Sequence, residues 1–339
     1  MVDIFDVADE AGVSTASVSR VLNAPYKTKA KTRSAVEKAV KKLGYIPNGA
    51  ARALSSRNSR VIGAIIPTID NSIFARGIQA LQSYLHDKGY YLLLGSSNYD
   101  PEQEYQLCQN FLVQQVAGII MMGNTHLPEC IYMLDKEQTP FVNTGTYSKD
   151  GNYCVGFNNR KAASIAAKFL VELGHRKFAM IAGITKDNDR AAERVEGIVQ
   201  ELARSGVELP KHRLLERPYE IEEGAAAFRY LMQLADSPTA IICGNDVLGF
   251  GVILESRKIG MKIPDQVSVI GFDDLVLSKH LTPSLSTIRI PTEEMWCRAA
   301  DTLLALLEDK EAPKAIEIDV SLVLRESTGA PPQMFDVTK

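Results

Sequence analysis

The chain has 339 residues, of which 45% are hydrophobic and 23% charged, and its formal net charge at pH 7 is -3. This length suits two or three globular domains, and no tract of low complexity is present. No apolar run approaches the ~18–20 residues of a membrane helix, the acidic start "MVDIFDVADE" is unlike a signal peptide, and five scattered cysteines without a CxxC point away from a disulfide framework or a zinc site. We therefore expect a cytoplasmic protein with no metal, no cofactor and no membrane partner.

Charge is distributed unevenly along the chain. Residues 1–60 carry eleven basic and five acidic side chains, a local charge of +6, which leaves -9 for the remainder. A basic head on an acidic body favours a polyanionic partner for the head alone, although such a head can also serve only solubility.

Residues 1–46 are predicted to form a small domain of three helices. Asp3 can cap the first helix, Gly12 is placed to end it, and Ser14 can cap the second. A third helix is expected after Thr28. Apolar residues recur at helical spacing in all three: Ile4, Val7, Ala8 and Ala11; Val18, Val21 and Leu22; Val36, Ala39, Val40 and Leu43. Two short helices around a tight turn, braced by a third, form a helix-turn-helix, whose second helix enters the major groove of DNA.

The outer face of the second helix has the chemistry for reading DNA. Arg20 can donate two hydrogen bonds to a guanine, and Thr15 can contact a base edge, while the small Ala16 permits close approach. Ser17 and Ser19 can bind phosphates, which positions the helix without reading sequence. The structural alternative is a three-helix bundle in which Arg20 is merely solvated.

Residues 47–60 are predicted to be a hinge helix and linker. Asn48 can cap a short helix from Gly49 to Leu54 that would order only against a partner. Leu54, an apolar residue in a polar segment, could wedge between base steps in the minor groove. The alternative is a plain interdomain linker with a chance leucine.

Residues 61–339 are predicted to form an α/β core of two lobes. Short apolar runs such as "VIGAIIP" and "AGIIMMG", and after residue 160 "KFAMIAG" and "VSVIGF", alternate with helical stretches. Such runs are typical of parallel sheets covered by helices on both faces. The boundaries we expect are about 61–158 and 291–320 for the N-lobe, and about 159–290 and 321–339 for the C-lobe.

Polar residues follow several of these runs, where ligands of open α/β sheets bind. They occur in "TIDNSIF", "ITKDNDRAAER", "GND" and "FDD". Asparagine, aspartate and arginine beside apolar walls suit a hydroxyl-rich ligand such as a sugar, although asparagine and aspartate are also common turn and cap residues.

The segments "DVADEAGVSTASVSRVLN", "LGYIPNGAARAL", "VIGAIIPTIDNSIF", "GNDVLGFGVI" and "VIGFDD" together resemble the bacterial LacI family of transcription regulators over essentially the whole chain. The resemblance implies a helix-turn-helix head and a core like the periplasmic sugar-binding proteins, crossed three times by the chain. It also implies a homodimer, an approximately palindromic double-stranded DNA operator, and a small-molecule effector, which we expect to be a sugar or sugar acid.

The resemblance assigns roles by position. Thr15, Ala16 and Arg20 would read bases, and Ala51 and Leu54 would lie in the minor groove, with Leu54 intercalating. The cleft would be lined by Asn71, Ile73, Phe74, Arg194, Asn245 and Asp273. Asn143 and Asn158 are weaker additions, since they follow or end strands but have less motif support. Asn158 replaces the family's usual acid, which suggests a different hydroxyl pattern or an acidic ligand. Gly49 and residues 29–31 also depart from the family pattern, at the hinge and at the start of the third helix.

Catalytic motifs are weak in this sequence. The five histidines lack HxH or HExxH spacing, and no GxSxG occurs. The resemblance implies a ligand-responsive repressor of carbohydrate-utilisation genes in a bacterial nucleoid, and the weak catalytic motifs point away from an enzyme. The alternatives are a corepressor-dependent regulator responding to a purine or another metabolite and, more distantly, a sugar receptor that does not act on DNA. Trp296 is expected to serve packing, although a lone tryptophan can also cover a sugar.

Overall fold

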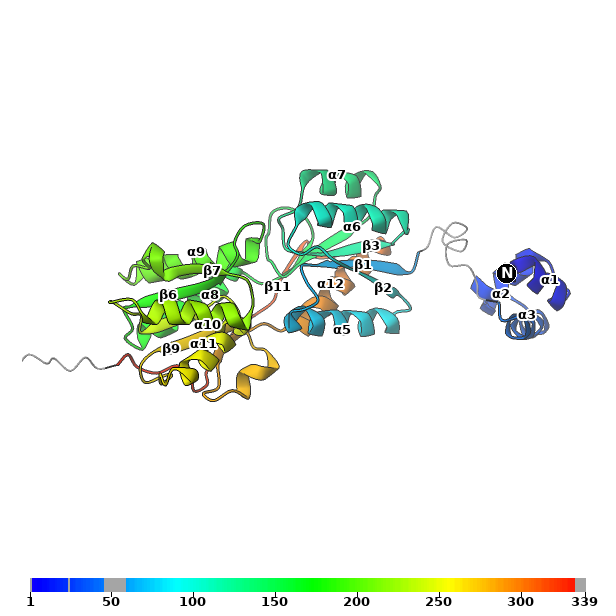
Figure 1. Cartoon of the computed structure of the whole chain (residues 1–339). Coiled ribbons are helices and arrows are strands. Elements are labelled where there is room, and N and C mark those ends of the chain that lie inside the picture. The colour runs from blue at the N-terminus through cyan, green and yellow to red at the C-terminus, as the bar shows by residue number, and fades with distance from the viewer. Residues whose placement is uncertain (1, 24, 46–58, 333–339) are drawn as a thin grey trace, which may run out of the picture. The chain divides into compact units, whose positions relative to one another are not determined.

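The computed structural model describes residues 2–23, 25–45 and 59–332 (Figure 1). It divides into two compact units, Met1–Ser59 and Arg60–Lys339.

The first unit is all helical. It contains α1 (Ile4–Ala11), α2 (Thr15–Asn23), a 3-10 turn η1 (Pro25–Lys27) and α3 (Ala30–Leu43). Its core is formed by apolar residues of all three helices, namely Val7, Ala8, Val18, Val21, Val36 and Ala39. These are residues of the helical stripes predicted from the sequence, because only that spacing turns one face of each helix inward.

Local hydrogen bonds define the ends of these helices. Asp3 caps α1 in a reciprocal capping box with Asp6, and Gly12 ends it at φ 63°. The Ser14 hydroxyl accepts the Ser17 amide at 3.2 Å at the start of α2. The third helix begins at Ala30, two residues after Thr28, and its preceding residue Lys29 makes no side-chain cap.

The second unit begins with a lobe built on a six-stranded parallel sheet of order β11-β5-β4-β3-β1-β2. The strands are β1 (Val61–Ile66), β2 (Tyr91–Ser96), β3 (Gly118–Met122), β4 (Phe141–Thr144), β5 (Cys154–Gly156) and β11 (Ala315–Glu317). Helices α6 (Pro101–Val113) and α7 (Pro128–Lys136) lie over one face, and α5 (Ser72–Asp87) and α12 (Thr292–Leu307) over the other (Figure 1). We call this the N-lobe.

The other lobe, the C-lobe, has a sheet of order β12-β10-β9-β8-β6-β7. Its strands are β6 (Phe178–Gly183), β7 (Leu214–Arg217), β8 (Ala240–Cys243), β9 (Ser268–Asp273), β10 (Ser286–Arg289) and β12 (Ser321–Val323). Its helices are α8 (Asn159–Glu172), α9 (Asp189–Arg204), α10 (Ile221–Met232) and α11 (Asp246–Lys258), with 3-10 turns η2 (Lys211–Arg213) and η3 (Val276–Lys279). One difference from the predicted parallel sheets is β12, which pairs antiparallel with β10. An antiparallel edge strand is common on otherwise parallel sheets.

The chain crosses between the two lobes three times. The chain passes from β5 to β6, from β10 through α12 to β11, and from β11 to β12. Each lobe therefore contains a segment that comes late in the sequence, and the space between the lobes is bordered by crossover segments.

Trp296 is a packing residue of the N-lobe. It is fully buried in α12, where α12 lies against α5, and a Cβ added at Gly77 of α5 would overlap its indole ring. We predict that Gly77→Ala lowers the free energy of unfolding by about 1–3 kcal/mol, since the closely packed ring must shift. At a helix position with free space around it, a glycine-to-alanine change raises stability by up to about 1 kcal/mol. A loss of stability therefore indicates a confined Gly77, and a gain indicates an open one.

Urea unfolding of Gly77→Ala beside Gln82→Ala, an exposed position of the same helix, measures this effect. A Gly77→Ala protein as stable as the parent would show that the indole is not confined by this contact.

Candidate functional site

The predicted DNA-reading residues lie along α2. Ala16 and Arg20 are exposed, whereas Thr15, Ser17 and Ser19 are half-buried. The Ser17 hydroxyl lies 3.0 Å from the Ser14 hydroxyl, so it also belongs to the cap of the helix. Arg20 thus extends from the surface of a helix whose opposite face holds the core residues Val18 and Val21. The hinge residues Ala51 and Leu54 lie outside the described residues.

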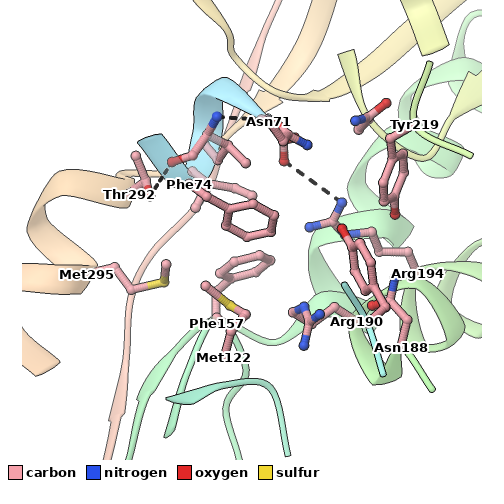
Figure 2. A pocket seen from close by; sticks show the side chains of 16 residues that line it. Asn71, Phe74, Met122, Phe157, Asn188, Arg190, Arg194, Tyr219, Thr292 and Met295 are labelled. Carbon is pink, nitrogen blue, oxygen red and sulfur yellow. Dashed lines mark hydrogen bonds and ion pairs between the residues drawn. The ribbon is translucent and has the colours of Figure 1, made fainter. Parts of the chain in front are cut away.

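A pocket lies between the two lobes of the core, and the space among its lining side chains, part of it open to solvent, is about 520 Å³. Figure 2 shows Phe74, Met122, Phe157 and Met295 on one side and Asn188, Arg190, Arg194 and Tyr219 on the other. The remaining lining residues are Asn71, Ile73, Tyr99, Gly145, Asn245, Asp273, Ile290 and Thr292. One wall is therefore apolar and the other is rich in hydrogen-bonding groups.

Arg194 is held rigidly on the polar wall. Its Nε donates to Asn159 Oδ1 at 3.0 Å and its Nη1 donates to the Gly244 carbonyl at 2.8 Å. Its guanidinium carbon lies 3.8 Å from the centroid of the Phe272 ring. These contacts fix the orientation of the guanidinium. Because this group has five N–H donors, some of them remain available to a ligand.

Asn245 and Asn71 each use one atom to cap a helix at the pocket. Asn245 Oδ1 accepts the Leu248 amide at 3.0 Å, and Asn71 Oδ1 accepts the Ile73 amide at 3.2 Å. Asn245 is 1% exposed, and its Nδ2 is buried without a hydrogen-bond partner among the described residues. A buried donor left unpaired costs about 1–3 kcal/mol, so a ligand oxygen at this position would gain that energy.

Asp273 is set in the pocket by strained backbone at the end of β9. Its φ is 112° and that of Asp274 is 55°, conformations that side-chain-bearing residues rarely adopt. Burial raises the pKa of the Asp273 carboxyl to about 8, although the nearby Arg194, whose Nη1 lies 3.9 Å from Oδ1, opposes the rise. The carboxyl is therefore suited to donate as well as accept hydrogen bonds near neutral pH.

Six of the residues assigned to the cleft from the sequence lie together in this pocket: Asn71, Ile73, Phe74, Arg194, Asn245 and Asp273. Asn143 and Asn158 are not among the lining residues. Asn143 is buried in β4, where its Nδ2 donates to Asn124 Oδ1 at 2.7 Å. Asn158 caps α8 through the Lys161 amide at 2.9 Å. Both side chains thus make hydrogen bonds within the protein, and neither contributes to the lining of the pocket.

Sequence reasoning missed five polar residues of the pocket: Tyr99, Asn188, Arg190, Tyr219 and Thr292. Arg190 precedes Arg194 by four residues, so the helical repeat places both on one face of α9 and could have revealed it. Tyr99 and Tyr219 lie just after the strands β2 and β7. Burial raises the pKa of both tyrosines, which keeps their hydroxyls protonated as donors.

The described ranges 2–23, 25–45 and 59–332 contain neither a metal-binding cluster nor a membrane-spanning helix. Within them, no cluster of three histidine, cysteine or acidic side chains could hold a metal ion. None of the helices in those ranges combines the length and apolar character needed to cross a bilayer.

Comparisons with known proteins cover both units. Residues 3–48 match the model of bacterial regulatory proteins, lacI family, and residues 167–328 match a periplasmic binding protein-like domain. The chain is 30% identical over 336 residues to the HTH-type transcriptional repressor PurR of Klebsiella pneumoniae (strain 342), covering 98% of each protein. It is 32% identical over 336 residues to the HTH-type transcriptional regulator GntR of Pseudomonas aeruginosa, covering 95% of this chain and 94% of the relative. A crystal structure of the lac repressor dimer bound to operator and the anti-inducer ONPF is similar at a TM-score of 0.86 and 26% identity, covering 97% of this chain and 99% of that one.

Proposed function

This chain belongs to the lacI family of bacterial regulatory proteins and is a transcriptional regulator, and from that premise we propose that it is a homodimeric repressor of carbohydrate-utilisation genes. Its effector is a sugar or sugar acid bound between the lobes. It acts on the bacterial chromosome, in the cytoplasm.

In this proposal two α2 helices read two half-sites of an approximately palindromic operator. Arg20 contacts a guanine, Thr15 and Ala16 contact base edges, and Ser17 and Ser19 contact phosphates. The exposure of Arg20 and Ala16 on one helix supports this assignment. Ala51 and Leu54 are proposed to contact the minor groove at the centre of the site.

The buried Nδ2 of Asn245, which has no hydrogen-bond partner in the described part of the chain, is the observation that supports an effector most directly. It lies in a pocket with the stacked Arg194 and the protonatable Asp273, opposite apolar side chains. A carbohydrate presents hydroxyls to such a polar wall and C–H groups to such an apolar wall. Binding that favours one arrangement of the lobes by about 1–3 kcal/mol would suffice to regulate operator affinity.

A purine corepressor is the second candidate. The identity to a repressor named PurR and the two aromatic rings Phe74 and Phe157 in the pocket favour it. Its effect on operator affinity is opposite to that of a sugar inducer, because a corepressor tightens operator binding whereas an inducer weakens it.

Selection of genomic DNA fragments by the purified full-length protein, with and without sugars, sugar acids and purines, tests the proposed function. We expect enrichment of sites with two-fold symmetry and a change in their affinity with one class of solute. No preference for any fragment would contradict operator binding, and fixed affinity with every solute would contradict effector control.

Arg20→Ala is predicted to weaken binding to the selected operator by about 1–3 kcal/mol for each half-site, since one bidentate base contact is lost in each. Specificity at one base position per half-site should relax. Gel-shift titration against a set of single-base operator variants measures both effects.

Lys38→Ala, which removes an exposed positive charge from α3, is the matched control and should weaken binding slightly and equally on all sequences. If Arg20→Ala behaves in the same uniform manner, Arg20 contacts a phosphate and not a base.

A further inference from the structure

Arg190 lies on the polar wall of the pocket and reaches the opposite lobe. It belongs to α9 of the C-lobe, and its side chain is 11% exposed. A side chain at Gly123, just after β3 of the N-lobe, would overlap the Arg190 guanidinium. Gly145, just after β4, also faces the Arg190 side chain. Both glycines have positive φ, so neither position readily accepts another residue. Figure 2 shows Arg190 directed toward the pocket beside Phe157.

Asp189 supports Arg190 from behind and also contacts the N-lobe. Its Oδ1 accepts a hydrogen bond from Arg190 Nη1 at 2.8 Å. Its Oδ2 accepts the backbone N–H of Asn124, which belongs to the N-lobe, at 2.6 Å. Both oxygens of the Asp189 carboxylate therefore accept hydrogen bonds, while the Arg190 guanidinium retains N–H donors for another partner.

The charges of the pocket lining do not cancel. Its charged or acidic side chains are Arg190, Arg194 and Asp273, and Asp189 forms an ion pair with Arg190. Burial raises the pKa of Asp273 to about 8, so this carboxyl is largely protonated at neutral pH. Two guanidiniums and one carboxylate then leave a single positive charge, which one monoanion would balance.

Arg194 is less available to an anion than Arg190. Its donors already bind Asn159 and the Gly244 carbonyl, and its face is stacked on Phe272. Arg190 has its one side-chain hydrogen bond within the described residues to Asp189. A carboxylate matches the two parallel donors of one guanidinium, whereas a phosphate dianion carries more charge than this pocket would balance.

We propose that the effector is a monoanionic polyhydroxy carboxylate, and that its carboxylate binds the Arg190 guanidinium. The hydroxyls then bind Asn245 Nδ2, Asp273 and Arg194, and the carbon skeleton lies against Phe74 and Phe157. This inference rests on the proposed function and narrows it from sugars in general to sugar acids. Because Arg190 spans the cleft, the bound carboxylate also holds the guanidinium in its position against the N-lobe.

Isothermal titration of the full-length protein with matched acids and neutral compounds tests the proposal. The probes are D-gluconate with D-sorbitol, D-galacturonate with D-galactose, D-glucose 6-phosphate, and hypoxanthine as a purine. We expect at least one acid to bind about tenfold or more tighter than its neutral counterpart, the gain of one charge-assisted bidentate contact. Equal or tighter binding of the neutral compound, preference for the phosphate or the purine, or binding by neither acid at millimolar concentration would each overturn it.

Arg190→Gln isolates the contact. This variant should reduce the preference for the acid over its neutral counterpart to about threefold or less, since the remaining amide cannot form the charged pair. Arg204→Gln, at an exposed position of the same helix, should retain the full preference. The unfolding midpoint by circular dichroism establishes that Arg190→Gln is folded. If Arg190→Gln lowers the affinity for the acid and for the neutral compound equally, Arg190 only contacts the N-lobe and does not bind the carboxylate.

Failure of this inference is distinguishable from failure of the proposed function. Gel shifts with the same probes report whether any solute alters operator affinity. An acid that binds through Arg190 without altering operator affinity would contradict effector control and leave the carboxylate site intact. A neutral sugar that alters operator affinity, with no acid that binds more tightly, would support effector control and contradict the carboxylate site.

Discussion

Arg194→Ala is expected to abolish the response to effector while the unliganded protein still binds its operator. The guanidinium contacts Asn159, the Gly244 carbonyl and the Phe272 ring. Its removal therefore deletes hydrogen-bond donors to the ligand and also the contacts that stabilise this wall of the pocket. Truncating one partner of a buried, hydrogen-bonded charged contact typically costs about 2–5 kcal/mol, which corresponds to roughly a 30-fold or larger rise in the effector dissociation constant. Isothermal titration and effector-dependent gel shifts measure the two properties.

Two further variants make this result interpretable. Arg194→Lys keeps the charge but loses the planar fork, and it should also lose most of the response. Arg204→Ala, at the exposed C-terminal end of the same helix, should retain it. Effector affinity in Arg194→Ala within a few-fold of the parent would show that the pocket does not bind ligand through this residue.

Asp273→Asn is expected to stabilise the ligand-free protein increasingly as the pH rises. Burial raises the pKa of Asp273 to about 8, whereas in an unfolded chain it titrates near 4, as an ordinary aspartate does. The folded parent must keep or take up a proton that the unfolded chain releases, so its stability falls as the pH rises from about 4 to about 8. The asparagine does not ionise and escapes this loss, so the variant should be more stable than the parent at pH 8 by on the order of 3–5 kcal/mol.

Urea unfolding at pH 5 and pH 8 without effector measures this difference, and the neighbouring Asp274 provides the control. Partial burial favours a higher pKa for Asp274, but hydrogen bonds from Arg325 and Arg289 hold it below its ordinary value. Asp274→Asn should therefore lower stability, by an amount that does not change between pH 5 and pH 8, where this carboxylate is ionised throughout. A constant difference between Asp273→Asn and the parent over the same range would mean that Asp273 is ionised in the folded protein.

The fold was predictable because periodicity reports which face of each element is buried. The stripes of α1, α2 and α3 and the apolar runs of the two sheets are patterns of this kind. The antiparallel edge strand β12 was not predictable, since a three-residue strand has too few residues to show a direction.

The pocket was predictable only in part, because the same residue types line pockets and cap helices. Asn245 and Asn158 both cap helices in the C-lobe, yet only Asn245 also places its amide in the pocket. What separates them is the tertiary position of the helix end, and the residue type carries no information about it. The strained turn at Asp273 is likewise invisible in sequence, since nothing in "FDD" distinguishes φ 112° from an ordinary strand end.

The division of the pocket into two chemically different walls has an evolutionary consequence. Asn188, Arg190 and Arg194 fall within seven consecutive positions at the start of α9, while the apolar side chains opposite come from other parts of the chain. A duplicated gene could therefore acquire a new signal through a few codon changes in one short stretch, and still inherit its target sites on the chromosome unchanged.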